Sequence, residues 1–255
     1  MLAELNLLPL WKLKTNSNKT SEVNINKPAQ INIGEVVNHK ETEETQGLFT
    51  GLGENYDETF SDKNHLAEIT SLNQLKGKVA TCQLCRLCES RTQTVFGFGD
   101  EKANWLFIGE APGENEDKLG EPFVGAAGKL LDNILQALQI NRHENVYIAN
   151  VIKCRPPGNR NPMPNEIEKC EPYLKKQIDL IQPKILIALG RFAAQTLLKT
   201  DKKIGSLRLQ KHDYQNIPVV VTYHPAYLLR NLSDKSKAWE DMLFAKKILL
   251  GLSAA

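Results

Sequence analysis

Apolar and polar residues form two repeating patterns in the second half of the chain. Short apolar runs that predict buried strands lie at residues 105–109, 146–151, 184–189 and 218–223. Each run is followed by apolar residues at helical spacing, which predicts helices at about residues 126–140, 166–181, 191–199 and 235–250. This alternation predicts an α/β protein with three layers, in which helices cover both faces of a central four-stranded, mainly parallel sheet.

Polar residues follow three of the predicted strands. Glu110, Asn150 and His224 each lie at or just past the end of such a strand. Ligands of open parallel sheets bind beyond the carboxyl ends of the strands. We therefore expect these three side chains to converge in space, although they are far apart in the sequence.

A long turn joins the strand at 105–109 to the helix that follows it. A connection of this kind needs only a few residues, yet this one is rich in glycine and carboxylates and contains Phe123. The length and composition are typical of a pocket wall, and equally of a surface loop that its own charges solvate. The residues of the turn leave both interpretations open.

The first part of the chain has a different composition. Residues 15–75 are rich in Asn, Thr, Glu, Ser and Lys and show no sustained period, which predicts a disordered or loosely ordered tether. Residues 1–14 are apolar and end in two lysines. They are suited to a helix that docks on a replication or repair protein, or to a segment folded back on the main domain. We therefore divide the chain into an acidic extension, 1–75, and a folded domain, 76–255.

Charge is distributed unevenly between these two parts. The chain has a formal net charge of +2, but residues 1–75 contain 6 Lys/Arg and 11 Asp/Glu, so the remaining residues carry an excess of positive charge. This excess is suited to a polyanion such as nucleic acid. No apolar run approaches the length of a membrane span, and the start lacks the features of a signal peptide. We expect a soluble, cytoplasmic protein that does not contact a membrane.

Five cysteines, an odd number, do not suggest a secreted disulfide framework. Cys82 and Cys85 form a Cys-x-x-Cys pair, and Cys154 and Cys170 lie much further along the chain. Four thiolates can bind zinc or an iron–sulfur cluster. Zinc ribbons use two close pairs, and the second pair here is too widely spaced for that pattern. Ordinary burial in the core is the alternative, and Cys88 is either structural or a substitute for Cys82.

Four motifs in this order resemble the family 4 uracil-DNA glycosylases, which contain an iron–sulfur cluster. The matching segments are residues 109–117 (GEAPGENED), 120–125 (GEPFVG), 150–157 (NVIKCRPP) and 224–230 (HPAYLLR). The resemblance extends over about residues 78–250 and implies the fold of that superfamily. It also implies that Cys82, Cys85, Cys154 and Cys170 hold a [4Fe-4S] cluster, with zinc as the less favoured cofactor.

The resemblance implies a role for five residues around an extruded uracil. Asn150 reads uracil through its side-chain amide, and Phe123 stacks on the base. Glu116 lies near uracil C5, where the methyl group of thymine would clash. Glu110 positions a water molecule or holds the sugar region, and His224 donates a hydrogen bond to uracil O2. Without the resemblance, each of these residues also has an ordinary structural interpretation, such as a turn, a core position or a helix cap.

The motif at 224–230 resembles the loop by which this family enters the minor groove of DNA. Leu228 and Leu229 would then wedge into the gap that the flipped base leaves. Arg230, Arg155 and Arg160 would bind phosphates. For each arginine, a solvated surface charge is the alternative interpretation.

The leading hypothesis is a monomeric DNA-repair enzyme that hydrolyses the N-glycosidic bond of uracil in DNA and leaves an abasic site. The alternative is a non-catalytic iron–sulfur or zinc module that binds DNA or a replication partner. A nucleotide enzyme of the Rossmann type is less consistent with the chain, because the glycines after residues 105–109 do not have the dinucleotide-binding spacing.

Overall fold

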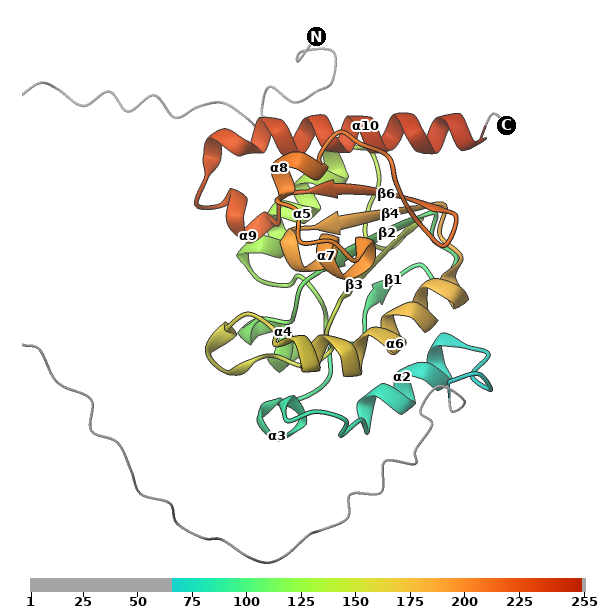
Figure 1. The fold of residues 1–255 in the computed structure, drawn as a ribbon, viewed down its shortest axis with the longest axis vertical. Helices are drawn as coiled ribbons and strands as arrows, with labels where there is room; N and C mark the ends of the chain where they lie inside the picture. Colours follow the sequence, from blue (N-terminus) through green and yellow to red (C-terminus); the bar gives the residue numbers. More distant parts are fainter. Residues whose placement is uncertain (1–65, 254–255) are drawn as a thin grey trace, which may run out of the picture. The chain divides into compact units, whose positions relative to one another are not determined.

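Four parallel strands form the centre of the sheet in the computed structural model, which describes residues 66–253 (Figure 1). They are β2 (Trp105–Gly109), β3 (Val146–Asn150), β4 (Ile185–Leu189) and β6 (Ile217–Thr222). Their order is β3-β2-β4-β6, and each pairs in parallel with its neighbours. The four strands predicted from the apolar runs are therefore confirmed.

Two short edge strands extend this sheet to six strands within the described residues. β1 (Phe98–Gly99) pairs antiparallel with β3, and β5 (His212–Tyr214) pairs antiparallel with β6. Neither strand has the long apolar run that identifies a buried strand, because an edge strand is partly exposed. The predicted four-stranded sheet is thus the parallel core of a larger, mixed sheet.

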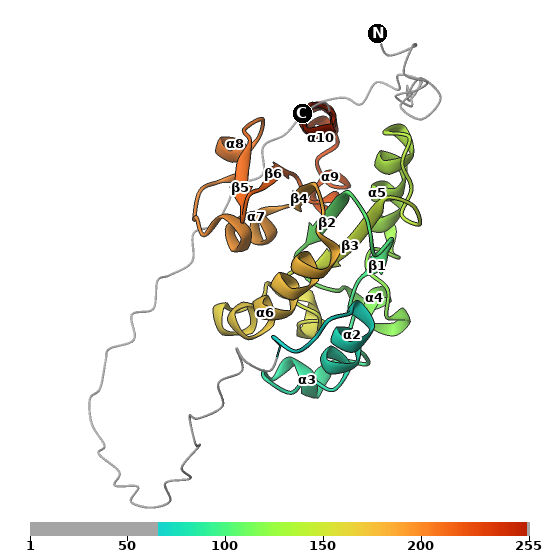
Figure 2. The ribbon, with the colours of Figure 1, turned by 90° about the vertical axis from the view of Figure 1, so that its right-hand side faces the viewer.

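Helices cover both faces of the sheet, as predicted. The helices of the first face are α2 (Leu72–Ala80), α6 (Pro164–Ile181) and α7 (Arg191–Leu198). The helices of the second face are α5 (Ala126–Ala137) and α10 (Lys235–Ser253). Figures 1 and 2 show α6 and α5 on opposite sides of the central strands.

The strands contribute alternate side chains to the two cores that result. Leu106 and Ile108 of β2 pack with the first group of helices, whereas Trp105 and Phe107 pack with the second. Every residue of β2, β3 and β4 is buried. Burial on both faces explains why these strands are continuous apolar runs rather than alternating ones.

Short helices connect these elements. They are α3 (Leu87–Ser90), α4 (Glu114–Leu119), η1 (Pro157–Asn159), α8 (Ile204–Leu207), α9 (Pro225–Leu228) and η2 (Leu232–Asp234). Among the helices of residues 66–253, none combines the length and apolar character that a membrane crossing requires.

Helix α2 crosses the boundary that the sequence suggests at residue 75. Leu72 and Leu75 are buried in the first core, and Ser71 caps the helix by accepting a hydrogen bond from the Gln74 amide. Part of the predicted extension, from Leu66 onward, therefore packs with the domain. The rest of that extension, including the proposed docking segment at 1–14, lies outside the described residues.

Candidate active site

The carboxyl ends of the four parallel strands open into one cavity of about 810 Å³. Glu110 follows β2, Asn150 ends β3, Gly190 and Arg191 follow β4, and His224 lies just after β6. All of these residues line the cavity. The predicted convergence of Glu110, Asn150 and His224 is therefore confirmed, and the expected site lies where a parallel sheet binds its ligands.

Asn150 reaches the floor of this cavity from the end of β3. It is 1% exposed, and among the described residues its side-chain oxygen, Oδ1, has no hydrogen-bond partner. A Cβ atom on the neighbouring Gly109 would lie 2.4 Å from Oδ1 and 2.7 Å from the ring of Phe123. Glycine at position 109 thus leaves the space in which the amide stands. A buried acceptor without a partner is costly, so this oxygen is suited to a ligand that donates a hydrogen bond.

Phe123 lines the cavity from the long turn before α5. Its backbone has a positive φ of 56°, a conformation that non-glycine residues seldom adopt. Arg142 stabilises it, because Nη2 donates a 2.9 Å hydrogen bond to the Phe123 carbonyl. A Cβ atom on Gly128 would lie 1.7 Å from that same carbonyl oxygen, so α5 can pack against the turn only with glycine there. The Phe123 ring lies 5.5 Å from the His224 ring, centroid to centroid.

Glu116 holds the same turn from helix α4. Its Oε1 atom accepts hydrogen bonds from the amides of Val124 and Gly125, at 2.9 and 3.0 Å. These two bonds fix the orientation of a carboxylate that lines the cavity. The long acidic turn is therefore a pocket wall.

His224 precedes α9 as its N-cap residue. The amide of Ala226 donates a 3.1 Å hydrogen bond to Nδ1, so a neutral His224 ring carries its proton on Nε2. Burial, assisted by the positive charge of Arg230, lowers the pKa of His224 to about 4. The ring is therefore neutral at pH 7, with an N–H group free to donate.

Glu110 and Arg191 both line the cavity, just past the ends of β2 and β4. Burial raises the pKa of the Glu110 carboxyl, and the nearby Arg191 guanidinium opposes this shift. Arg191 is exposed and lies 4.6 Å above the ring of Phe192. Arg191 and Phe192 also line the cavity, although neither was predicted from the sequence. Their position just after the third predicted strand, 184–189, would have identified them by the same reasoning that identified Glu110, Asn150 and His224.

The three arginines predicted to bind phosphates differ in their surroundings. Arg230 is exposed and lines the cavity. Arg160 also lines it, but both of its terminal nitrogens bond to the Glu166 carboxylate, at 2.9 and 2.6 Å. Arg155 is half-buried and donates a 2.7 Å hydrogen bond to Asn159. Only Arg230 of the three has no protein hydrogen bond described for its guanidinium in residues 66–253.

The two leucines of the predicted wedge point in different directions. Leu229 is 41% exposed, next to the cavity-lining Arg230. Leu228 is 1% exposed and packs in the core beside α5 and α10. The prediction that Leu228 faces DNA is therefore corrected, because one turn of α9 directs adjacent residues to different sides.

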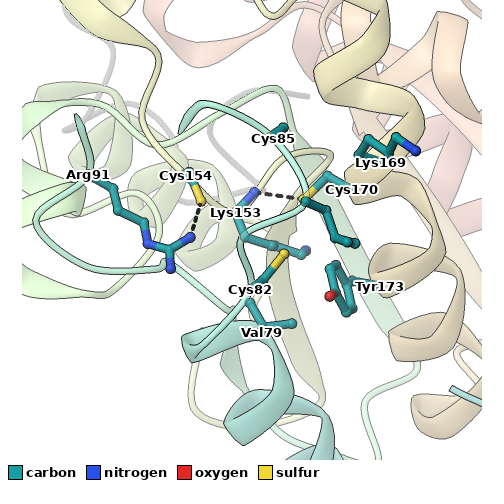
Figure 3. Close-up of a pocket in the computed structure, with 10 residues that line it drawn as sticks. Val79, Cys82, Cys85, Arg91, Lys153, Cys154, Lys169, Cys170 and Tyr173 are labelled. Carbon is teal, nitrogen blue, oxygen red and sulfur yellow. Dashed lines mark hydrogen bonds between the residues drawn. The ribbon is translucent and has the colours of Figure 1, made fainter. Parts of the chain in front are cut away.

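The four predicted ligand cysteines surround a second, smaller pocket. Cys82, Cys85, Cys154 and Cys170 all line it, and Figure 3 shows them around a common space with Arg91 and Lys153. Cys88 does not line this pocket. Arg91 donates a hydrogen bond of 3.1 Å to the Cys154 sulfur, and the Lys153 amide donates one of 3.3 Å to the Cys170 sulfur.

The surroundings of these cysteines are suited to thiolate ligands. Within residues 66–253, no three His, Cys, Asp or Glu side chains gather as ligands of a single metal ion. Four cysteines around one pocket can bind zinc or an iron–sulfur cluster as thiolates, and the two cations beside them would offset the charge of those thiolates. Burial raises the pKa of Cys154, and it raises that of Cys170 to about 12. Binding a cluster must therefore displace their protons.

A family model and several curated proteins that resemble this chain both point to uracil-DNA glycosylases. Residues 96–243 match the family model described as the uracil DNA glycosylase superfamily. Similar curated proteins include three named Type-4 uracil-DNA glycosylase. That of Sulfurisphaera tokodaii is 45% identical over 67% of this chain and 81% of its own length. That of Archaeoglobus fulgidus is 44% identical over 62% of this chain and 83% of its own length. That of Saccharolobus solfataricus is 42% identical over 70% of this chain and 87% of its own length.

Proposed function

This chain belongs to the uracil DNA glycosylase superfamily, and we propose that it removes uracil from DNA by hydrolysing the N-glycosidic bond, leaving an abasic site. One observation carries the proposal: the unpartnered, buried Oδ1 of Asn150 shares a cavity with Phe123, Glu110 and the neutral ring of His224. A base can reach this cavity only after it leaves the helical stack, as in other enzymes that act on bases.

Asn150 selects uracil over cytosine. Its Oδ1 accepts a hydrogen bond from uracil N3–H, and its amide nitrogen donates one to uracil O4. Cytosine presents the opposite pattern at these two positions. It would leave buried polar groups unpaired, at a cost of about 1–3 kcal/mol each.

Phe123 and Glu116 shape the rest of the base pocket. The flat face of Phe123 stacks on the base and supplies affinity without selecting between bases. Glu116 lies near uracil C5 and excludes the methyl group of thymine by steric conflict. Its two hydrogen bonds to backbone amides make it a rigid wall for this purpose, since the carboxylate cannot turn away without breaking them.

His224 stabilises the leaving group. When the bond between C1′ of the sugar and N1 of uracil breaks, its electron pair passes to the base, and negative charge develops on the uracil oxygens. The Nε2–H group of a neutral His224 donates a hydrogen bond to O2 as this charge grows. A donor already oriented in a buried site is worth most in the transition state.

Glu110 holds the attacking water or the sugar region. Its half-buried carboxylate lies past the end of β2, with Arg191 as the nearby cation. The water oxygen bonds to C1′, one of its protons remains as the new hydroxyl, and the other ends on uracil. Leu229 and Arg230, exposed at the rim, contact the DNA on either side of the flipped nucleotide.

Cys82, Cys85, Cys154 and Cys170 hold a [4Fe-4S] cluster in this proposal. When bound, the cluster supplies cross-links between segments that are far apart in the sequence. Because hydrolysis transfers no electron, we assign it a structural role. Ligation at Cys154 would restrain the segment that begins at Asn150, four residues earlier.

A cleavage assay tests the proposal. Uracil-containing single- and double-stranded oligonucleotides are incubated with the wild-type chain and with Asn150→Ala, then treated with alkali to break abasic sites. We expect strand breaks with the wild type. With Asn150→Ala, the rate of uracil release should fall at least about 100-fold, because the two hydrogen bonds from the Asn150 amide to uracil are lost. Binding of both oligonucleotides without any release of uracil would instead identify a non-catalytic DNA-binding module.

A further inference from the structure

Lys153 occupies an unusual position between the active-site cavity and the four-cysteine pocket. The residue is 1% exposed. Its ammonium group donates hydrogen bonds of 2.7 Å to the carbonyl of Asn150 and 2.5 Å to Oε1 of Gln177. A buried charge is retained only where hydrogen bonds compensate for its lost hydration, so both partners are needed.

The backbone of the same residue belongs to the four-cysteine pocket. The Lys153 amide donates a hydrogen bond to the Cys170 sulfur, drawn as a dashed line in Figure 3, and Cys154 is the next residue. Lys153 is also one of the residues that line that pocket. Lys153 therefore contacts a candidate cluster ligand through its main chain and the uracil-reading residue through its side chain.

The end of β3 depends on this side chain. Asn150 is the last residue of the strand, and a lysine ammonium binds its carbonyl. Gln177 anchors the ammonium from α6, the helix that also carries Cys170, and its own amide donates a 2.9 Å hydrogen bond to the Phe96 carbonyl. A shift of α6 or of the cysteine loop would thus move the carbonyl, and with it the amide that faces the cavity.

We propose that Lys153 is a positioning residue that couples the geometry of the four-cysteine site to the uracil-reading side chain of Asn150. This inference rests on the proposed function, since it concerns how accurately the Asn150 side chain is placed against uracil. Misplacing a group in an active site by about 1 Å can lower a rate about 100-fold. Lys153 itself does not line the active-site cavity and acts only through Asn150.

A double-mutant cycle on the full-length protein, purified with its cluster, tests the coupling. The variants are Lys153→Met, Cys170→Ser and the combination, and the measurements are kcat and KM for uracil release and the visible absorbance of the cluster. We expect Lys153→Met to lower kcat by about 100-fold with a smaller change in KM, and to retain the absorbance. Cys170→Ser alone should lose the absorbance and lower kcat by about 100-fold, but should lower kcat less than about threefold further in the Lys153→Met background.

Lys169→Met is the matched control, because it removes an exposed lysine beside the same cysteines that has no described contact with Asn150. Its kcat should equal that of the wild type. If Lys153→Met does not fold, Gln177→Leu removes the anchor of the ammonium and should give the same split between kcat and KM.

A wild-type kcat in Lys153→Met would overturn the coupling. So would a double variant whose loss of kcat equals the product of the losses in Lys153→Met and Cys170→Ser. An equal loss in Lys169→Met would also overturn it, because the effect would then be one of charge near the cysteines. These outcomes require an active wild type, whereas an inactive wild type would contradict the proposed function instead.

Discussion

The side-chain oxygen of Asn150 lies 2.4 Å from the point that a Cβ atom on Gly109 would occupy. The two residues are partners in neighbouring parallel strands, and the missing side chain of one makes room for the amide of the other. The buried oxygen remains without a partner in the described part of the chain. The space beside Gly109 thus determines where the Asn150 amide lies in the cavity.

Gly109→Ala should impair uracil release. The added methyl group would press on Asn150 and on the Phe123 ring, which lies 2.7 Å from the Cβ position. The Asn150 side chain must therefore move. We expect kcat/KM to fall by about 100-fold and stability by about 1–3 kcal/mol. Gly77→Ala is the control, because a Cβ atom there meets nothing within 4 Å. Kinetics and denaturant unfolding of both variants measure the difference, and wild-type kinetics in Gly109→Ala would refute the assignment.

The pH dependence of uracil release should reflect the lowered pKa of His224. A histidine with an ordinary pKa would become charged near pH 6.5, but His224 stays neutral in the folded protein until about pH 4. We therefore expect kcat to show no fall centred on pH 6.5. Because the unfolded chain binds a proton at higher pH than the folded one, His224 should also make stability fall as pH drops from about 6.5 toward 4.

Arg230→Met provides a check on the origin of this shift. The positive charge of Arg230 lowers the pKa of His224, so its removal should move the titration of His224 to higher pH at low salt. NMR titration of the imidazole follows this directly, apart from any titration of Glu110. An unchanged His224 titration in Arg230→Met would show that burial alone accounts for the lowered pKa.

Leu228→Ala and Leu229→Ala should affect different properties of the protein. Leu228 is buried in the core, so its truncation should cost about 2–5 kcal/mol of stability. Leu229 is exposed, so its truncation should change stability by less than about 0.5 kcal/mol. It should slow release from duplex DNA more than from single strands, because only a duplex leaves a gap to fill. Equal rates for Leu229→Ala and wild type on duplex DNA would contradict the wedge.

A buried ion pair supports the strand that leads to His224. Asp241 is fully buried, and its Oδ2 atom accepts hydrogen bonds from Thr222 at 2.7 Å and from Arg208 at 2.8 Å. Asp241→Asn should cost about 3–5 kcal/mol, because it leaves the Arg208 guanidinium without its buried partner and with only the exposed Glu240 carboxylate, at 3.6 Å. Chemical denaturation measures this loss. The double variant Asp241→Asn/Arg208→Met should lose less than the two single losses combined, and strict additivity would contradict the pairing.

Cys154→Ser tests the proposed cluster role. It removes one of four ligands, so cluster absorbance should be lost, and both stability and uracil release should fall with it. Cys88→Ser is the control, since Cys88 does not line the pocket, and it should keep its absorbance and activity. A Cys154→Ser protein without absorbance but with full stability and activity would refute the restraint on the Asn150 segment. A colourless Cys88→Ser would instead make Cys88 a ligand.

The apolar pattern was sufficient to predict the parallel core and its covering helices. Strands buried on both faces must be continuously apolar, and helices packed on a sheet must repeat their apolar residues every three or four positions. Because parallel strands align their carboxyl ends, the order of strands and polar residues also predicted that Glu110, Asn150 and His224 share one cavity. These features follow from local composition and chain direction, which the sequence contains.

Other features depend on which residues become neighbours after folding. β1 and β5 exist through pairing with β3 and β6, and their own composition does not require a strand. Likewise, the sequence does not determine whether Leu228 or Leu229 faces the core. Lysine is usually exposed, so the sequence favours an exposed Lys153 over the buried one observed. The unpartnered oxygen of Asn150 arises because Gly109, far away in the sequence, leaves space beside it. Packing between distant segments determines these contacts, so only the tertiary structure shows them.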